Sequence, residues 1–221
     1  MRMLWLAAVV AAAGAGCTDT TSAAGGPTQV AASQTIVAFG DSLTAGKGLD
    51  DDEAYPAVLG RMLRAAGLPF SIKNHGVSGD TSADAVRRLD AALAESPAIM
   101  IVALGANDGL RGVPVAEVRR NLETIIEAAQ ARKITVLLCG MEALPINGWE
   151  YTLAFHRLFP TLAEKYNVPL VPFLLNGVIG NPRMVQQDHV HPNAAGAAEM
   201  ARTIWPYLQP LALQIAGVAT I

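Results

Sequence analysis

The sequence contains very little cysteine, with only two in 221 residues. Cys17 closes an apolar leader, and Cys139 closes the apolar run Ile134–Cys139. A structural disulfide is therefore not expected, even in an oxidising compartment. A cysteine nucleophile needs a polar, partly open setting, which an apolar run does not offer. We expect Cys139 to be a small buried hydrophobic residue.

The sequence also lacks any clustering of charge. It carries 16 Lys and Arg against 19 Asp and Glu, without a basic stripe or an acidic tail. Nucleic-acid binding needs clustered basic side chains that replace counterions, so this pattern excludes that class of function.

A phosphate-binding loop is absent as well, although FGDSLTAGKG at residues 39–48 superficially suggests one. That motif requires four residues between its two glycines and a Ser or Thr after its lysine. Here five residues separate Gly40 from Gly46, and Gly48 follows Lys47. The glycines are therefore interpreted as loop residues, and Ser42 becomes the residue of interest.

The first 17 residues have the three-part form of a secretory signal: one basic residue, an apolar stretch, then small residues. The apolar stretch is too short and too rich in small residues for a lasting membrane span. Gly14–Cys17 resembles a bacterial lipobox, but Gly14 replaces the usual leucine, and Ser22–Ala24 offers an ordinary cleavage site instead. We expect an exported, periplasmic protein, either anchored by a lipidated Cys17 or released.

Residues 18–33 are rich in Thr, Ser, Ala and Gly without periodicity, which indicates a flexible tether. One domain is expected over residues 34–221. In it, apolar runs of strand length alternate with stretches of helical periodicity. The expected strands are 35–39, 70–74, 98–104, 134–139 and 168–171, and the expected helices are 55–66, 82–95, 115–132, 151–165 and 194–208. This alternation favours an α/β fold, a parallel sheet covered by helices on both faces.

Polar, glycine-rich segments follow the first three expected strands, and a further polar segment precedes the last helix. They read GDSLT, HGVSGDT, GANDG and QQDHVHPN. Parallel sheets bind ligands beyond the carboxyl ends of their strands, so these segments are expected to converge on one edge.

Ser42 is placed to act as a nucleophile just past the first strand, although the segment lacks the second glycine of the G-x-S-x-G elbow. A serine site also needs a base, an orienting acid and oxyanion donors. Asp188 stands three residues before His191, a spacing that can bring carboxylate and imidazole together in a turn. The N–H groups of Ser42 and Gly79 and the side chain of Asn107 are candidate donors.

Two alternatives remain open for the histidine segment. His189 is an alternative base, and Asp188, His189 and His191 are zinc ligands by residue type. Because no other His or Cys lies in a plausible partner segment, a metal is not expected. We expect Asp41 to cap local backbone N–H groups and Asp108 to be structural.

The segments GDSL, GVSGDT, GAND and DHVHP, in this order and spacing, resemble the four blocks of the SGNH (GDSL) hydrolase family. The match is closest to the bacterial periplasmic branch of arylesterases, acyl-CoA thioesterases and lysophospholipases. The resemblance implies a flavodoxin-like three-layer α/β/α sandwich with a five-stranded parallel sheet. It implies Ser42 as nucleophile, His191 as base and Asp188 as its orienting acid, with an oxyanion hole from Ser42, Gly79 and Asn107.

We therefore expect a serine esterase that hydrolyses carboxylic esters and thioesters, such as aryl esters, acyl-CoA or lysophospholipids, through an acyl-enzyme. No cofactor, metal or nucleic acid is expected to take part, and the family resemblance suggests a monomer. The alternatives are a carbohydrate O-acetylesterase on the same fold and a non-catalytic, ligand-binding lipoprotein. The segment around residues 141–151 departs from the family's pattern, which leaves the substrate preference open.

Overall fold

Five parallel strands form one sheet in the computed structural model, which describes residues 34–218. The strands are β1 (Gln34–Gly40), β2 (Phe70–Gly76), β3 (Ile99–Ala103), β4 (Thr135–Cys139) and β5 (Leu170–Val171). Their order across the sheet is β2-β1-β3-β4-β5. The expected signal peptide (1–17) and tether (18–33) lie outside the described residues.

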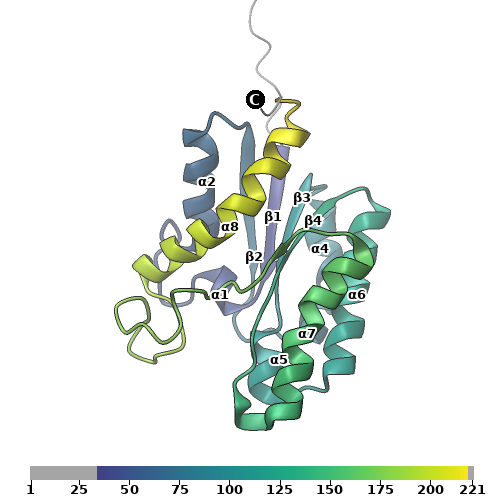
Figure 1. Ribbon diagram of the computed structural model, residues 1–221. Helices are drawn as coiled ribbons and strands as arrows, with labels where there is room; N and C mark the ends of the chain where they lie inside the picture. The colour runs from purple at the N-terminus through teal and green to yellow at the C-terminus, as the bar shows by residue number, and fades with distance from the viewer. Residues whose placement is uncertain (1–33, 219–221) are drawn as a thin grey trace, which may run out of the picture. The chain divides into compact units, whose positions relative to one another are not determined.

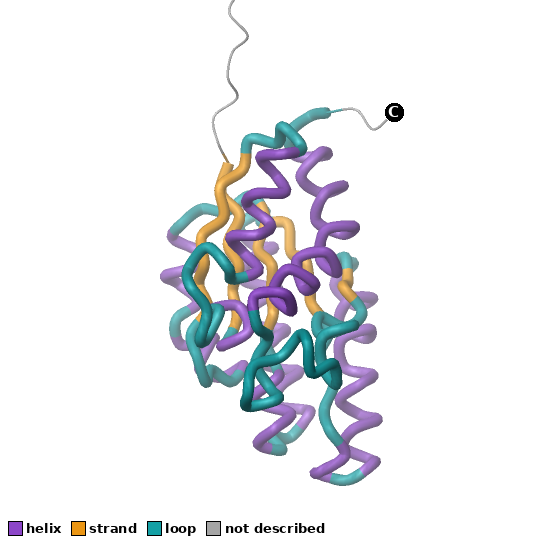
Figure 2. Tube along the Cα trace, turned by 90° about the vertical axis from the view of Figure 1, so that its left-hand side faces the viewer, coloured by secondary structure: helices purple, strands orange, loops and turns teal. Residues whose placement is uncertain are grey.

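Helices cover both faces of this sheet (Figures 1 and 2). On one face α2 (Tyr55–Ala65) packs against α8 (Ala194–Ile215). On the other, α6 (Val115–Ala131) packs between α3 (Ser82–Arg87) and α7 (Trp149–Tyr166). The predicted α/β/α sandwich with a five-stranded parallel sheet is therefore confirmed. Between residues 34 and 218, no helix combines the length and the hydropathy that crossing a membrane requires.

The position of each strand follows from its side chains. The central strands β1 and β3 carry continuous apolar runs that are fully buried, Ile36–Phe39 and Ile99–Ala103. Strands that helices cover on both faces are expected to carry such continuous apolar runs. The edge strand β2 instead exposes Lys73 and Asn74. Polar and charged side chains at an edge oppose pairing with another chain.

The helix expected over residues 82–95 is broken. It consists of α3 and a separate α4 (Leu89–Ala94), with Arg88 between them at φ −113° and ψ 10°. The Arg88 guanidinium donates hydrogen bonds to the carbonyls of Gly40 and His75 at the ends of β1 and β2. These distant bonds, which no local pattern reveals, replace one continuous helix by two short ones.

The last helix is longer than expected and runs through two prolines to Ile215. Proline normally interrupts a helix because it lacks an N–H group. Here Pro206 and Pro210 lie four residues apart on the exposed side. The opposite side buries Met200, Ile204, Leu208 and Ala212 at the same spacing. This burial outweighs the lost hydrogen bonds and brings part of the apolar C-terminal segment into the core.

Candidate active site

The carboxyl ends of β1 and β3 lie side by side, with Gly40 paired to Ala103. After β1 the chain continues to β2 on one side of this pair, and after β3 it continues to β4 on the other side. Parallel α/β sheets bind ligands at the point where the chain turns in opposite directions in this way. Two short helices that the sequence did not predict begin here, α1 (Ser42–Ala45) and α5 (Ala106–Arg111). They are too short to show periodicity. They carry Ser42 and Asn107 at their first turns.

Ser42 is the first residue of α1 and follows a tight turn. A Cβ on Gly40 would lie 2.6 Å from the carbonyl oxygen of Ala103, so only glycine fits this position. Asp41 caps α1, because its Oδ1 accepts the N–H of Leu43 at 3.0 Å. The capping role predicted for Asp41 thus matches the structure. Ser42 is held at the strand end and remains 8% exposed.

Ser42, His191 and Asp188 form a hydrogen-bonded chain. Ser42 Oγ lies 3.1 Å from His191 Nε2, and His191 Nδ1 lies 2.6 Å from Asp188 Oδ2. Asp188 Oδ1 accepts the backbone N–H groups of Val190 at 3.0 Å and His191 at 2.9 Å. The three residues predicted as nucleophile, base and orienting acid, 149 positions apart at the extremes, are therefore in contact.

The hydrogen bond from the His191 ring, with the two backbone N–H groups, holds the pKa of Asp188 well below its usual range. An ionised carboxylate beside Nδ1 favours the tautomer that carries its proton on that nitrogen. The lone pair of Nε2 then faces the Ser42 hydroxyl. This is the arrangement in which an imidazole takes a proton from a serine as it attacks.

The loop before α8 holds His191 through its own hydrogen bonds. The Gln186 N–H donates to the His191 carbonyl at 2.7 Å, and the Gln186 side chain donates to the carbonyls of Lys47 and Pro192. Asn193 caps α8 by accepting the N–H of Gly196 at 3.0 Å. The histidine loop is thereby tied to the segment that follows α1.

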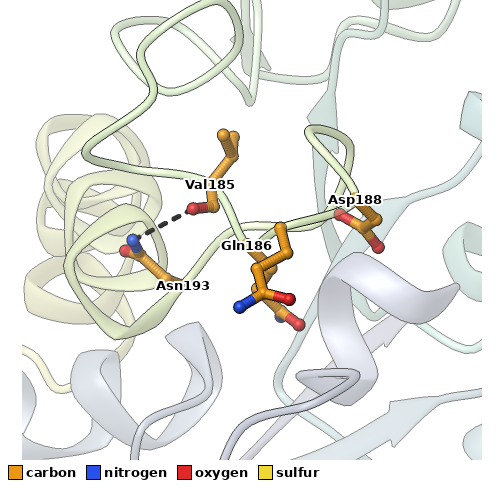
Figure 3. A pocket seen from close by; sticks show the side chains of 5 residues that line it. Val185, Gln186, Asp188 and Asn193 are labelled. Atoms are coloured by element: carbon orange, nitrogen blue, oxygen red, sulfur yellow. Dashed lines mark hydrogen bonds between the residues drawn. The ribbon is translucent and has the colours of Figure 1, made fainter.

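A shallow hollow of about 590 Å³ lies beside this loop (Figure 3). It is lined by Val185, Gln186, Gln187, Asp188 and Asn193. The hollow therefore adjoins the acid end of the hydrogen-bonded chain and is rich in amide groups.

The three predicted oxyanion donors lie on neighbouring segments. Asn107 Nδ2 donates to the carbonyl of Asp80 at 2.9 Å and lies 3.5 Å from Asp41 Oδ2. The amide of Asn107 thus lies between Asp80, the residue after Gly79, and Asp41, the residue before Ser42. Gly79 has φ +89°, a conformation that side chains with a Cβ rarely adopt. Within residues 34–218, the N–H groups of Ser42 and Gly79 donate no hydrogen bond to another protein group.

Two buried carboxyl groups lie behind these donors. Burial, together with a smaller contribution from the nearby charges of Asp108 and Asp80, raises the pKa of Asp41 to about 7. Burial also raises the pKa of Asp108, which accepts hydrogen bonds from the N–H (2.8 Å) and the hydroxyl (2.7 Å) of Ser82. Asp108 thus ties α5 to the start of α3, consistent with the structural role predicted for it. The contact between Asp108 and Ser82 was not predicted from the sequence.

The remaining histidines and the cysteine lie apart from this chain. His189 is exposed at φ +57° and has no side-chain hydrogen bond to another described residue. His75 lies 3.5 Å from Glu95, and His156 lies 2.7 Å from Glu142. Both ring nitrogens of His191 face protein groups, which disfavours the zinc interpretation. Cys139 is fully buried, as expected, and burial raises the pKa of its thiol.

Comparison with known proteins finds a matching family and several relatives. A family model described as the GDSL-like lipase/acylhydrolase family matches residues 38–199. The chain is 40% identical over 185 residues to "Esterase TesA" of Pseudomonas aeruginosa, across 83% of this chain and 92% of that protein. It is 36% identical over 185 residues to "Thioesterase 1/protease 1/lysophospholipase L1" of Escherichia coli K12, across 83% and 87%. The crystal structure of the psychrotrophic esterase EstA from Pseudoalteromonas sp., inhibited by monoethylphosphonate, superposes with a TM-score of 0.76 at 31% identity, across 80% of this chain and 97% of that one.

Proposed function

The chain belongs to the GDSL-like lipase/acylhydrolase family and is an ester-hydrolysing enzyme, and we propose that it works by covalent catalysis at Ser42. The observation that carries this proposal is the hydrogen-bonded chain from Ser42 through His191 to Asp188. A nucleophile, a base within reach and an acid that orients the base are the components of serine acyl transfer. The alternative of a non-catalytic, ligand-binding lipoprotein is set aside, because the family and its esterase relatives show an ester-hydrolysing enzyme.

In the proposed first step, His191 Nε2 takes the Ser42 proton while Oγ attacks the acyl carbonyl carbon. The carbonyl π electrons move onto oxygen and give a tetrahedral oxyanion. That intermediate collapses as His191 donates its proton to the leaving alcohol or thiol, which leaves an acyl-Ser42 ester. Water then attacks this ester with His191 again as base, and the carboxylic acid departs while Ser42 regains its proton.

We assign the oxyanion hole to the N–H groups of Ser42 and Gly79 and the amide of Asn107. The unpaired state of both N–H groups and the position of the Asn107 amide beside Asp80 and Asp41 support this assignment. In a comparable site, one such donor contributes roughly 2.7–4 kcal/mol to the transition state.

The proposed substrates are carboxylic esters and thioesters with an apolar acyl part, such as aryl esters, acyl-CoA and lysophospholipids. Exposed apolar side chains stand on the same segments as the site residues: Val77 near Gly79, Leu110 near Asn107, and Val190 beside His191. Such side chains favour contact with an apolar chain near the scissile bond. The names of the esterase and thioesterase relatives agree with this class.

A carbohydrate O-acetylesterase is a second candidate. The hollow beside Asp188 supports it, since the side chains of Gln186, Gln187 and Asn193 suit hydroxyl-rich ligands. A panel of p-nitrophenyl esters from acetyl to palmitoyl, with palmitoyl-CoA, lysophosphatidylcholine and acetylated xylan, separates the two candidates. Turnover of acetylated xylan alone would favour the second one.

The test of the proposed chemistry is covalent labelling of Ser42 by a fluorophosphonate probe, with Ser42→Ala as control. We expect one label per wild-type molecule, no label on the variant, and loss of p-nitrophenyl butyrate hydrolysis in the variant with its unfolding transition unchanged. Hydrolysis by Ser42→Ala at near wild-type rate would exclude Ser42 as the nucleophile.

Export is proposed from the leader sequence alone, with Cys17 as the lipidated residue and the periplasm as the compartment. Metabolic labelling with an alkyne palmitate in a bacterial host, comparing wild type with Cys17→Ala, tests the anchor. Label on both proteins or on neither would reject lipidation of Cys17. A monomer is proposed for the released domain, and light scattering measures it.

A further inference from the structure

Arg88 and Arg87 are neighbours with opposite surroundings. The Arg87 side chain is 70% exposed and pairs with Asp84 one turn away on the same helix. The Arg88 side chain is 23% exposed and lies where α3 ends and α4 begins. The break between these helices therefore sends one of two adjacent guanidinium groups into the protein, toward the carboxyl edge of the sheet.

Every nitrogen of the Arg88 guanidinium donates a hydrogen bond. Nη2 donates to the Gly40 carbonyl at 2.7 Å, and Nη1 donates to the His75 carbonyl at 2.8 Å. Nε donates to Asp80 Oδ2 at 2.6 Å, and the guanidinium carbon lies 4.4 Å from the centre of the Phe39 ring. Only a planar fork of fixed geometry can reach all of these partners, so lysine cannot replace arginine here.

These partners adjoin the residues assigned to the oxyanion hole. Gly40 lies two positions before Ser42, and Asp80 directly follows Gly79. Arg88 is thus a rigid link between the peptide that leads to the Ser42 N–H and the loop that carries the Gly79 N–H. The Gly40 carbonyl also accepts the N–H of Val77 at 3.1 Å, which draws the same two segments together.

The loop is held from its other side as well. The Asp80 carbonyl accepts a hydrogen bond from Asn107 at 2.9 Å, and the Gly79 carbonyl accepts one from Arg111 at 2.9 Å. With Arg88 on the Asp80 carboxylate, three side chains fix two consecutive residues, two of them from α5 and one from the junction between α3 and α4. A glycine with a free N–H and a positive φ would otherwise be mobile.

We propose that Arg88 is a positioning residue that sets the distance between the Ser42 and Gly79 N–H donors and so pre-organises the oxyanion hole. This inference rests on the proposed serine mechanism. Donors act on the oxyanion without reorganisation only when they are already in place, and an error near 1 Å is enough to lower the rate by about 100-fold. The residue acts on the transition state and leaves ground-state binding alone.

The experiment compares Arg88→Lys and Arg88→Gln with the matched control Arg87→Gln. Fluorophosphonate titration counts active sites, so that each kcat refers to correctly folded molecules. We expect kcat for p-nitrophenyl butyrate to fall by about 10- to 100-fold in both Arg88 variants, with KM within about threefold. The control keeps wild-type kcat and KM.

Inhibition by an alkyl trifluoromethyl ketone distinguishes a positioning role of Arg88 from a purely structural role, which would leave the inhibition constant unchanged. The ketone adds to the serine and places an oxyanion in the hole, so its inhibition constant should weaken by the same factor as kcat/KM falls. An Arg88 variant with a lower melting temperature but wild-type kcat per active site and wild-type ketone affinity would overturn the proposal.

Asp80→Asn covers the case in which the Arg88 variants fail to fold, because it weakens one contact and leaves the bonds to Gly40 and His75. It should lower kcat and ketone affinity together, and its effect should not add to that of Arg88→Lys in the double variant. Wild-type kcat in Asp80→Asn rejects the positioning role. If the wild-type protein itself takes no label at Ser42, the serine mechanism fails instead, so the two failures are distinguishable.

Discussion

Asp188 binds His191 through both of its carboxylate oxygens. Oδ2 lies 2.6 Å from the ring nitrogen Nδ1, and Oδ1 accepts the backbone N–H of the same residue at 2.9 Å. The spacing of three residues makes this possible, since the turn brings the histidine back over the carboxylate. The imidazole is thereby oriented by its own loop, with Nε2 left 3.1 Å from Ser42 Oγ.

Asp188→Asn should lower kcat for p-nitrophenyl butyrate by about 10⁴-fold, the effect of this change in serine proteases. An amide has no charge to stabilise the imidazolium, and it favours the wrong tautomer at Nε2. Steady-state kinetics, normalised to folded protein by circular dichroism, measure the loss. A decrease below about tenfold would mean that the carboxylate is not the orienting acid.

His189 provides the matched test of the base, because it lies two residues from His191 and is exposed. His189→Asn should keep kcat within about twofold of wild type, since asparagine tolerates the positive φ of this position. His191→Asn should reduce kcat to the level of Ser42→Ala. The reverse result in the two variants would make His189 the base.

Asn107→Ala should lower kcat by about 10²- to 10³-fold and leave KM nearly unchanged, because its bond to the substrate oxygen strengthens only in the transition state. The methyl side chain leaves the Asp80 carbonyl without its donor, so the unfolding midpoint in urea is measured in parallel. A higher KM at constant kcat would assign Asn107 to ground-state binding instead.

Much of the site could be predicted because its parts follow strands. The apolar runs of β1 and β3 locate the carboxyl edge, and Ser42 and Asn107 lie in the short segments that follow these strands. Once the topology is parallel, residues far apart in sequence must meet at that edge. The resemblance to SGNH hydrolases, carried by these same segments, is confirmed by the family match over residues 38–199.

The features that escaped prediction depend on contacts between distant segments. Arg88 lies in a sequence with helical periodicity, and only its hydrogen bonds to the carbonyls of Gly40 and His75 explain why the helix is interrupted at this residue. Pro206 and Pro210 suggest an earlier end to α8, but burial of the opposite face continues the helix. Local propensity cannot anticipate either outcome, because tertiary packing decides both.

Asp41 should make the stability of the protein depend on pH. Its folded-state pKa of about 7 lies above the value of about 4 expected in the unfolded chain, so the folded state holds the proton more tightly. The stability that this proton contributes is fully present below about pH 4 and is lost as the pH rises through about 7. Asp41→Asn keeps a capping oxygen but cannot ionise.

The free energy of unfolding of wild type, relative to Asp41→Asn, should therefore decrease between about pH 4.5 and about pH 8, by an amount on the order of a few kcal/mol. Urea unfolding of both proteins at the two pH values measures this difference. A difference that stays constant with pH would show that Asp41 does not titrate in this range in the folded protein.

Two glycine substitutions should have opposite effects on stability. In Gly40→Ala the new Cβ would lie 2.6 Å from the Ala103 carbonyl oxygen between two central strands, so backbone must move. Overpacking of this kind typically destabilises by about 1–3 kcal/mol. In Gly60→Ala the Cβ meets only the end of the Arg64 side chain at 3.6 Å, within helix α2. That change should stabilise by about 0.4–1 kcal/mol, because alanine restricts the unfolded chain.

Urea unfolding of both variants at neutral pH tests this contrast, and p-nitrophenyl butyrate kinetics show whether the strain reaches the site. Because Gly40 lies two residues before Ser42 and accepts the hydrogen bond from Arg88, Gly40→Ala should lower kcat in the molecules that remain folded. Gly60→Ala lies in the middle of α2, outside the segments that carry the site residues, and should keep wild-type kcat. Equal stability of the two variants would mean that the turn before Ser42 accommodates a Cβ without strain. The close packing at the end of β1 would then not be the feature that holds Ser42 in place.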